Sequence, residues 1–127
     1  MIFPITLPPT IDQISTIVEA LTRGGVVLMP ADTIYGLHAV ATNDAAVERI
    51  AAMKGREDVK PFVVLGASVS QIETLGVAIP QDVRSVLDSL WPAPLTAILP
   101  LRAPVAASRG AATLAVRIPA PFWVRTL

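Results

Sequence analysis

The sequence predicts an α/β protein in which helices flank a mixed sheet. Segments with apolar residues at helical spacing alternate with short apolar runs of the kind that form buried strands. Twelve prolines and seven glycines divide the chain into many short elements, which favours this architecture over a helical bundle. With 127 residues, the chain is expected to be a single domain spanning residues 1–127.

The first predicted helix has its apolar residues, Ile14, Ile17 and Val18 among them, three and four positions apart. Thr10, three residues before Gln13, is the start of a capping box, and two glycines at 24–25 are a plausible stop. The run "VVLMP" then predicts a buried strand, and "ADTIYGLHAVAT" is expected to be part loop and part strand.

A second helix is expected from residues 42–44 to Met53. Ser68 with Gln71 predicts another capping box, before a short helix. Pro80 opens a further helix, stopped by "WPAP". The apolar residues at helical spacing in this helix are Val83, Val86, Leu87 and Leu90. The remaining predictions are strands in "PFVVLG", "LTAILPL" and "ATLAVRIP", and a short last helix opened by Pro119 and Pro121.

The composition excludes several classes of function. There is no cysteine, so disulfide and thiolate chemistry are ruled out, and a single histidine makes a protein-built metal site improbable. The apolar runs are too short to span a bilayer, and the first residues lack the features of a signal peptide. A cytoplasmic protein without membrane association is therefore expected.

The segment "KGREDVKPF" concentrates the charge of the chain. Five of the twenty charged residues lie between Lys54 and Lys60, which are also the only two lysines. Lys54 continues the apolar stripe of its helix and is expected at the rim of the core, with Gly55 as a left-handed cap. These charges could simply complement the helix dipole. Alternatively, Lys54 and Arg56 could form an anion pocket, since ammonium and guanidinium groups bind phosphate and carboxylate.

Four blocks in order, "PADTIYGL", "KGREDVKPF", "WPAPLT" and "TLAVRIP", resemble the YrdC-like family of threonylcarbamoyl-AMP synthases. The resemblance runs from about Gly24 to Pro119 and implies a YrdC-like twisted sheet of parallel and antiparallel strands. It also implies synthesis of threonylcarbamoyl-adenylate from L-threonine, bicarbonate and ATP, with release of pyrophosphate. A downstream transferase would pass the threonylcarbamoyl group to tRNA, and Mg²⁺ would be carried on ATP.

Site residues follow from the resemblance by position. Lys54 and Arg56 would be the catalytic pair and bind ATP, together with Lys60 and Thr113. For L-threonine, the family pattern implies Thr33, Tyr35 and Arg117.

Two other residues near these motifs have alternative interpretations. An arginine in an apolar strand is costly unless paired, so Asp32 could instead be a structural partner of Arg117. His38 is expected to be a packing or surface residue and not a catalyst.

The sequence departs from the family pattern at three places. Ala31 stands where the family usually has a threonine that contacts the amino acid, and His38 and Ala93 replace usual glycines. The Ser-x-Asn motif, which follows the "RIP" block in the family, is not present, so the domain is expected to be incomplete at its C-terminal end.

Two alternatives to the synthase therefore stay open. The first is a non-catalytic relative that binds nucleotide or RNA, and the second is a domain that forms carbamoyl-adenylate. The net charge of zero and only six aromatic residues argue against RNA contact. Four arginines and no acidic residue after Asp88 argue for it.

Overall fold

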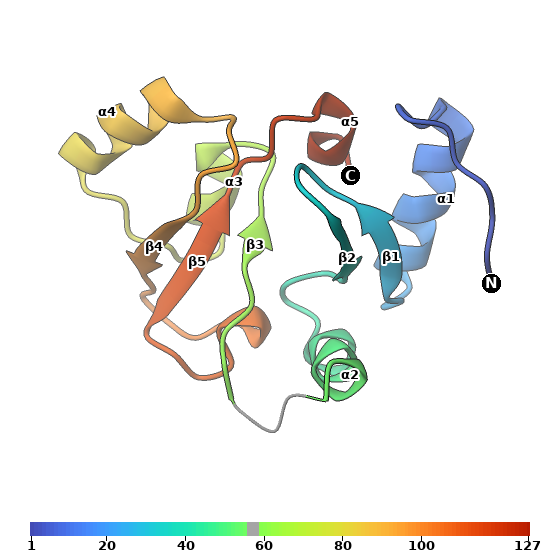
Figure 1. Ribbon diagram of the computed structural model, residues 1–127. Helices are drawn as coiled ribbons and strands as arrows, with labels where there is room; N and C mark the ends of the chain where they lie inside the picture. Colours follow the sequence, from blue (N-terminus) through green and yellow to red (C-terminus); the bar gives the residue numbers. More distant parts are fainter. Residues whose placement is uncertain (56–58) are drawn as a thin grey trace.

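The computed structural model describes residues 1–55 and 59–127 and shows the α/β architecture that the sequence predicts (Figure 1). The described helices are α1 (Ile11–Thr22), α2 (Asp44–Met53), α3 (Val69–Thr74), α4 (Gln81–Leu90), the 3-10 helix η1 (Ala106–Ser108) and α5 (Phe122–Arg125). The described strands are β1 (Val27–Pro30), β2 (Tyr35–His38), β3 (Val64–Leu65), β4 (Ala97–Pro100) and β5 (Thr113–Arg117). In the described ranges, no helix is long and apolar enough to cross a membrane.

The strands form two sheets, one of which is the mixed sheet that the sequence predicts. β1 and β2 pair as an antiparallel hairpin. The second sheet has the order β3-β5-β4, with β3 parallel and β4 antiparallel to β5, so the mixed character lies in this sheet. In Figure 1 the hairpin stands beside β3, between the three-stranded sheet and α1.

The larger core lies under the three-stranded sheet. Leu114 and Val116 of β5 are fully buried and pack with residues of β3, β4, α3 and α4, including Ile72 and Trp91. Because side chains alternate along a strand, Thr113, Ala115 and Arg117 lie on the opposite, more open face of β5. That face is therefore available to a ligand.

A second group of buried residues belongs to α1, β1 and α2. Ile17 and Met29 are buried, and α2 contributes its inward face. Asn43 caps α2 by accepting a hydrogen bond from the Ala46 N–H, and Gly55 (φ +60°) follows its end as the left-handed residue that the sequence predicts. These contacts fix the direction in which α2 ends.

Three local predictions need correction. In α4 the buried residue is Leu87, whereas Val86 and Leu90 are about half exposed, because the inward face continues at Val83 and Trp91. The Ser68 box forms only in part: its hydroxyl accepts from the Gln71 N–H, but the Gln71 side chain accepts from Ala67. The third concerns Lys54, described below.

Candidate anion-binding site

Lys54 is the first predicted site residue in the charged segment of residues 54–60. It is the C-cap of α2, directly after the helix ends at Met53, and its N–H donates to the Ile50 carbonyl. The predicted position at the rim of the core is wrong: Lys54 is exposed, because the buried stripe of α2 stops at Ala51. Arg56, its predicted catalytic partner, lies outside the described residues.

The Lys54 ammonium has two described neighbours that define its place. Its Nζ lies 5.7 Å from the centre of the Phe62 ring, a cation–π distance. Its charge also contributes to the lowered pKa of His38, although burial of the imidazole is the larger cause. Lys54 therefore lies where the hairpin strand β2 approaches the segment that leads into β3.

Arg117 lies at the other end of the same junction, at the end of β5. Its Nη1 donates to both carboxylate oxygens of Asp32 at 3.1 and 3.2 Å. Nε and Nη2 donate to the Thr96 hydroxyl at 3.0 and 2.8 Å. The Asp32 side chain is 3% exposed, so this ion pair is nearly buried and joins the hairpin to the three-stranded sheet. The structural pairing with Asp32, which the sequence left open, is confirmed.

Thr96 is a hydrogen-bond partner of Arg117 that the sequence did not reveal. It lies in the "WPAPLT" block, just before β4. Continuing the antiparallel register of β4 and β5 by one residue places Thr96 opposite Arg117. The contact between Thr96 and Arg117 could be predicted only from this strand register. The motif alone does not show which side chain the threonine faces.

The remaining predicted residues are all exposed. Thr33 lies in the turn of the hairpin and Tyr35 begins β2, with 61% of its surface exposed. Thr113 begins β5, four residues from Arg117 and on the same face. Lys60 lies in the segment before β3. All are accessible to a ligand, and their individual roles stay predictions.

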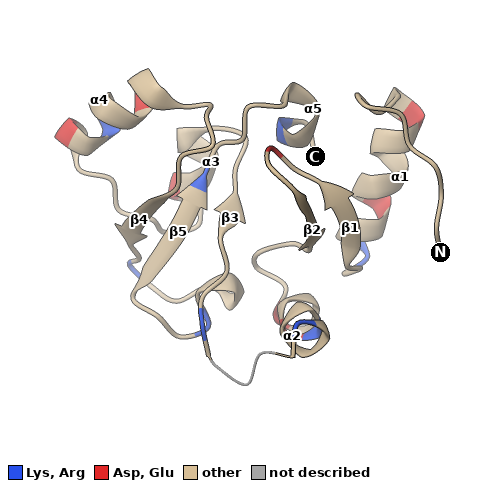
Figure 2. Cartoon of the chain, viewed as in Figure 1, with Lys and Arg blue, Asp and Glu red and all other residues tan. Residues whose placement is uncertain are grey.

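The structure thus brings Arg117 together with Asp32 and Thr96, and Lys54 together with Phe62. Among the described residues, no hydrogen bond or ion pair joins these two groups. The strand β2, from Tyr35 to His38, is itself roughly 10 Å long at the usual rise of a strand. Figure 2 shows that charged positions lie mainly on helices and loops and that the strands have few of them.

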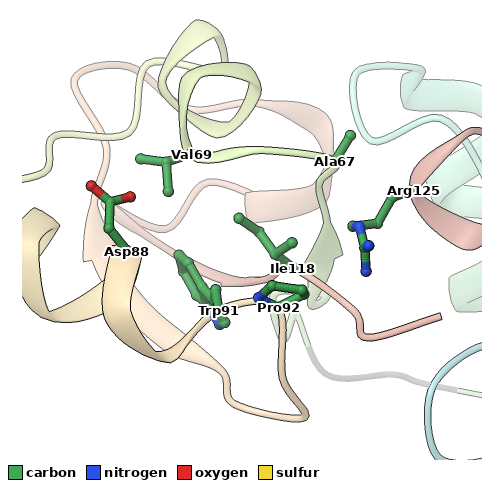
Figure 3. Close-up of a pocket in the computed structure, with 7 residues that line it drawn as sticks. All are labelled: Ala67, Val69, Asp88, Trp91, Pro92, Ile118 and Arg125. Carbon is green, nitrogen blue, oxygen red and sulfur yellow. The ribbon is translucent and has the colours of Figure 1, made fainter. Parts of the chain in front are cut away.

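A pocket lies between α3, α4, α5 and the segment around Pro92 (Figure 3). It has a volume of about 250 Å³. The Arg125 guanidinium at its edge donates to the carbonyls of Pro119 and Ala120 at 2.7 and 2.5 Å. None of the predicted site residues lines this pocket, whose residues are Ala67, Val69, Asp88, Trp91, Pro92, Ile118 and Arg125.

Comparison with known proteins identifies the family. The profile of the Sua5/YciO/YrdC family, described as "Telomere recombination", matches residues 19–127. The threonylcarbamoyl-AMP synthase of Pyrococcus abyssi is 38% identical over 102 residues, covering 79% of this chain and 30% of the relative. That of Bacillus subtilis is 36% identical over 110 residues, covering 84% of this chain and 32% of the relative.

The fold agrees with this assignment. The crystal structure of P. abyssi Sua5 complexed with L-threonine superposes with a TM-score of 0.84 at 34% identity, covering 92% of this chain and 35% of that one. The chain thus spans about a third of the length of these relatives. Because the family profile matches most of its residues, the chain belongs to the Sua5/YciO/YrdC family.

Proposed function

We propose that this chain carries the ATP- and threonine-binding part of a threonylcarbamoyl-AMP synthase. The observation that supports it most is the identity of 36–38% to proteins of that name over 79–84% of the chain. The likeness to a Sua5 structure complexed with L-threonine points to the same amino acid. The product would serve the threonylcarbamoyl modification of tRNA through a downstream transferase.

In the proposed reaction, the amino group of L-threonine and bicarbonate give a carbamate and water. A carbamate oxygen then attacks the α-phosphorus of ATP, the bond between the α- and β-phosphates breaks, and pyrophosphate leaves. The product is threonylcarbamoyl-adenylate. Mg²⁺ would arrive on the triphosphate and offset part of its charge.

The junction between the two sheets suits a ligand pair with several anionic groups. Lys54, at one end, would bind ATP phosphates together with Arg56, Lys60 and Thr113. Cations fixed at such positions stabilise the charge that develops on the phosphoryl oxygens.

At the other end, Arg117 would bind the threonine carboxylate, with Thr33 and Tyr35 bordering the amino acid. A guanidinium has five N–H donors, so Arg117 can bind a ligand carboxylate while it keeps its bonds to Asp32 and Thr96. This role and the structural pairing are compatible.

The proposal is tested by incubating the chain with ATP, Mg²⁺, bicarbonate and L-threonine, then measuring pyrophosphate and the adenylate by mass spectrometry. We expect both products, and we expect Lys54→Ala to lose them because it removes a phosphate-binding charge. Arg23→Ala is the matched control, since Arg23 is an exposed cation paired with Glu19 on α1. Pyrophosphate release that does not need L-threonine, or that survives Lys54→Ala, would contradict the proposal.

A further inference from the structure

Arg109 has an unusual backbone and an unusual burial for a residue on a connecting segment. It follows η1 with φ +49°, and it is the only non-glycine residue with positive φ in the described part of the chain. The left-handed conformation is unfavourable for a residue that has a side chain. Its side chain is only 9% exposed, which is rare for an arginine unless it is paired. Both features indicate that the position of this guanidinium is specified by its contacts.

Those contacts connect Arg109 to α2 on one side. Nε lies 3.4 Å from Oε1 of Glu48, and Nη2 lies 3.4 Å from Oε2. The two planar groups thus face each other in the bidentate arrangement that only arginine can provide. Glu48 lies on α2, six residues before Lys54, which caps the end of that helix.

On its other side, Arg109 contacts the ring that holds Lys54. The guanidinium carbon lies 5.8 Å from the centre of the Phe62 ring, which also has the Lys54 ammonium at 5.7 Å. Two cations near one ring repel each other, and the Glu48 carboxylate offsets part of the Arg109 charge. One ring can therefore hold both side chains.

Backbone hydrogen bonds of η1 also hold the Phe62 segment close to α2. The Phe62 N–H donates to the Ala107 carbonyl at 2.9 Å, and the Ala107 N–H donates to the Ala41 carbonyl at 3.0 Å. The η1 segment is thus hydrogen-bonded both to the segment that carries Phe62 and to the segment that precedes α2. Arg109 extends from the end of this bridge.

We propose that Arg109 is a positioning residue that fixes the Lys54 ammonium through Glu48 and Phe62. A lysine side chain has four rotatable bonds, and ordering it when a phosphate binds costs free energy. A preset contact with Phe62 reduces that cost. The consequence for ATP binding rests on the proposed function, whereas the position of Lys54 does not.

The position of Lys54 can be measured without any ligand. The chain has two lysines, so labelling with [¹³C]lysine gives two ε-CH₂ signals, and Lys60→Arg assigns them. The Phe62 ring current is expected to shift the Lys54 signal upfield, and Phe62→Leu should remove that shift. We expect Arg109→Gln to move the signal toward that of a free lysine while the amide spectrum stays that of a folded chain.

Two further variants make this result interpretable. Glu48→Gln removes the partner charge and leaves the Arg109 backbone unchanged, so it should move the Lys54 signal in the same direction even if Arg109→Gln fails to fold. Arg84→Gln removes another arginine that is ion-paired, to Glu73, and should leave the signal unchanged. A Lys54 signal that stays in place in folded Arg109→Gln or Glu48→Gln would overturn the proposal.

ATP titration then tests the consequence. Arg109→Gln should weaken ATP binding about three- to ten-fold, a free-energy change of about 0.6–1.4 kcal/mol. The affinity for L-threonine, which is bound at the other end of the junction, should not change. If the wild-type chain does not bind ATP, the proposed function fails, while the lysine spectra still decide whether Arg109 positions Lys54.

Discussion

His38, the last residue of β2, is the one histidine in the sequence. The sequence predicted a packing or surface role for it. In the structure its Nε2 is buried and has no hydrogen-bond partner among the described residues. Burial lowers the pKa of His38 below its ordinary value of 6.5, and the nearby Lys54 charge lowers it further, against the raising effect of a hydrogen bond to the Met29 backbone. The imidazole is therefore neutral at pH 7.

This pKa makes stability depend on pH. As the pH falls below about 6.5, the unfolded chain takes up the proton before the folded chain does, so the free energy of unfolding should decrease until the pH passes the folded pKa. We expect urea unfolding to show this loss between pH 7 and pH 5, and His38→Gln to show less of it. His38 is the only histidine, so its NMR titration is unambiguous. A midpoint at or above 6.5 would contradict the assignment.

Site residues differ in how far the sequence could specify them. The motifs predict Lys54 and Arg117 as candidates, and the cost of an unpaired arginine correctly suggested Asp32 as a partner of Arg117. Thr96 and Arg109 could not be identified, because their roles depend on strand register and on a contact between segments 61 residues apart. Local sequence patterns reveal neither the strand register nor a contact between distant segments.

Among helices and strands, local sequence signals such as capping boxes predicted the structure most reliably. The Thr10 hydroxyl accepts from the Gln13 N–H at 3.3 Å, and the Gln13 side chain accepts from the Thr10 N–H at 2.9 Å, so this capping box is confirmed. The 3-10 helix η1 was missed because its small apolar residues give no periodic signal. β3 is only two residues long, since its length depends on pairing with β5 and not on its own apolar run.

The capping box allows a quantitative prediction. Thr10→Ala should lower the free energy of unfolding by about 1 kcal/mol, because the Gln13 N–H loses its acceptor. Thr10→Ser keeps the hydroxyl and serves as the control. Urea denaturation at constant pH measures both variants. Equal stability of Thr10→Ala and Thr10→Ser would mean that this cap contributes nothing.

In the molecule as a whole, the buried residues form two packed groups. The larger core lies around β5, and the other buried residues belong to α1, β1 and α2. The Asp32–Arg117 pair, the Glu48–Arg109 pair and the hydrogen bond from Ala107 to Ala41 connect them. Apolar periodicity predicted the elements but not their division into two sheets, because strand pairing is decided by contacts distant in sequence.

The candidate site lies at this connection, so a ligand that binds both ends would stabilise the two parts together. A ligand that binds only the folded state raises the unfolding midpoint by mass action. Lys54 and Arg117 lie at opposite ends of the junction and would bind different anionic groups. Mg-ATP and L-threonine together should therefore stabilise the chain more than either does alone.

Thermal unfolding of the 127-residue chain, with and without Mg-ATP and L-threonine, tests the central claim most directly. We predict one cooperative transition whose midpoint rises with Mg-ATP and rises further when L-threonine is added. In Lys54→Ala the Mg-ATP part of the rise should disappear, because the variant lacks the phosphate-binding ammonium. A midpoint that responds to neither ligand in the wild-type chain would contradict the account that this junction binds the substrates of a threonylcarbamoyl-AMP synthase.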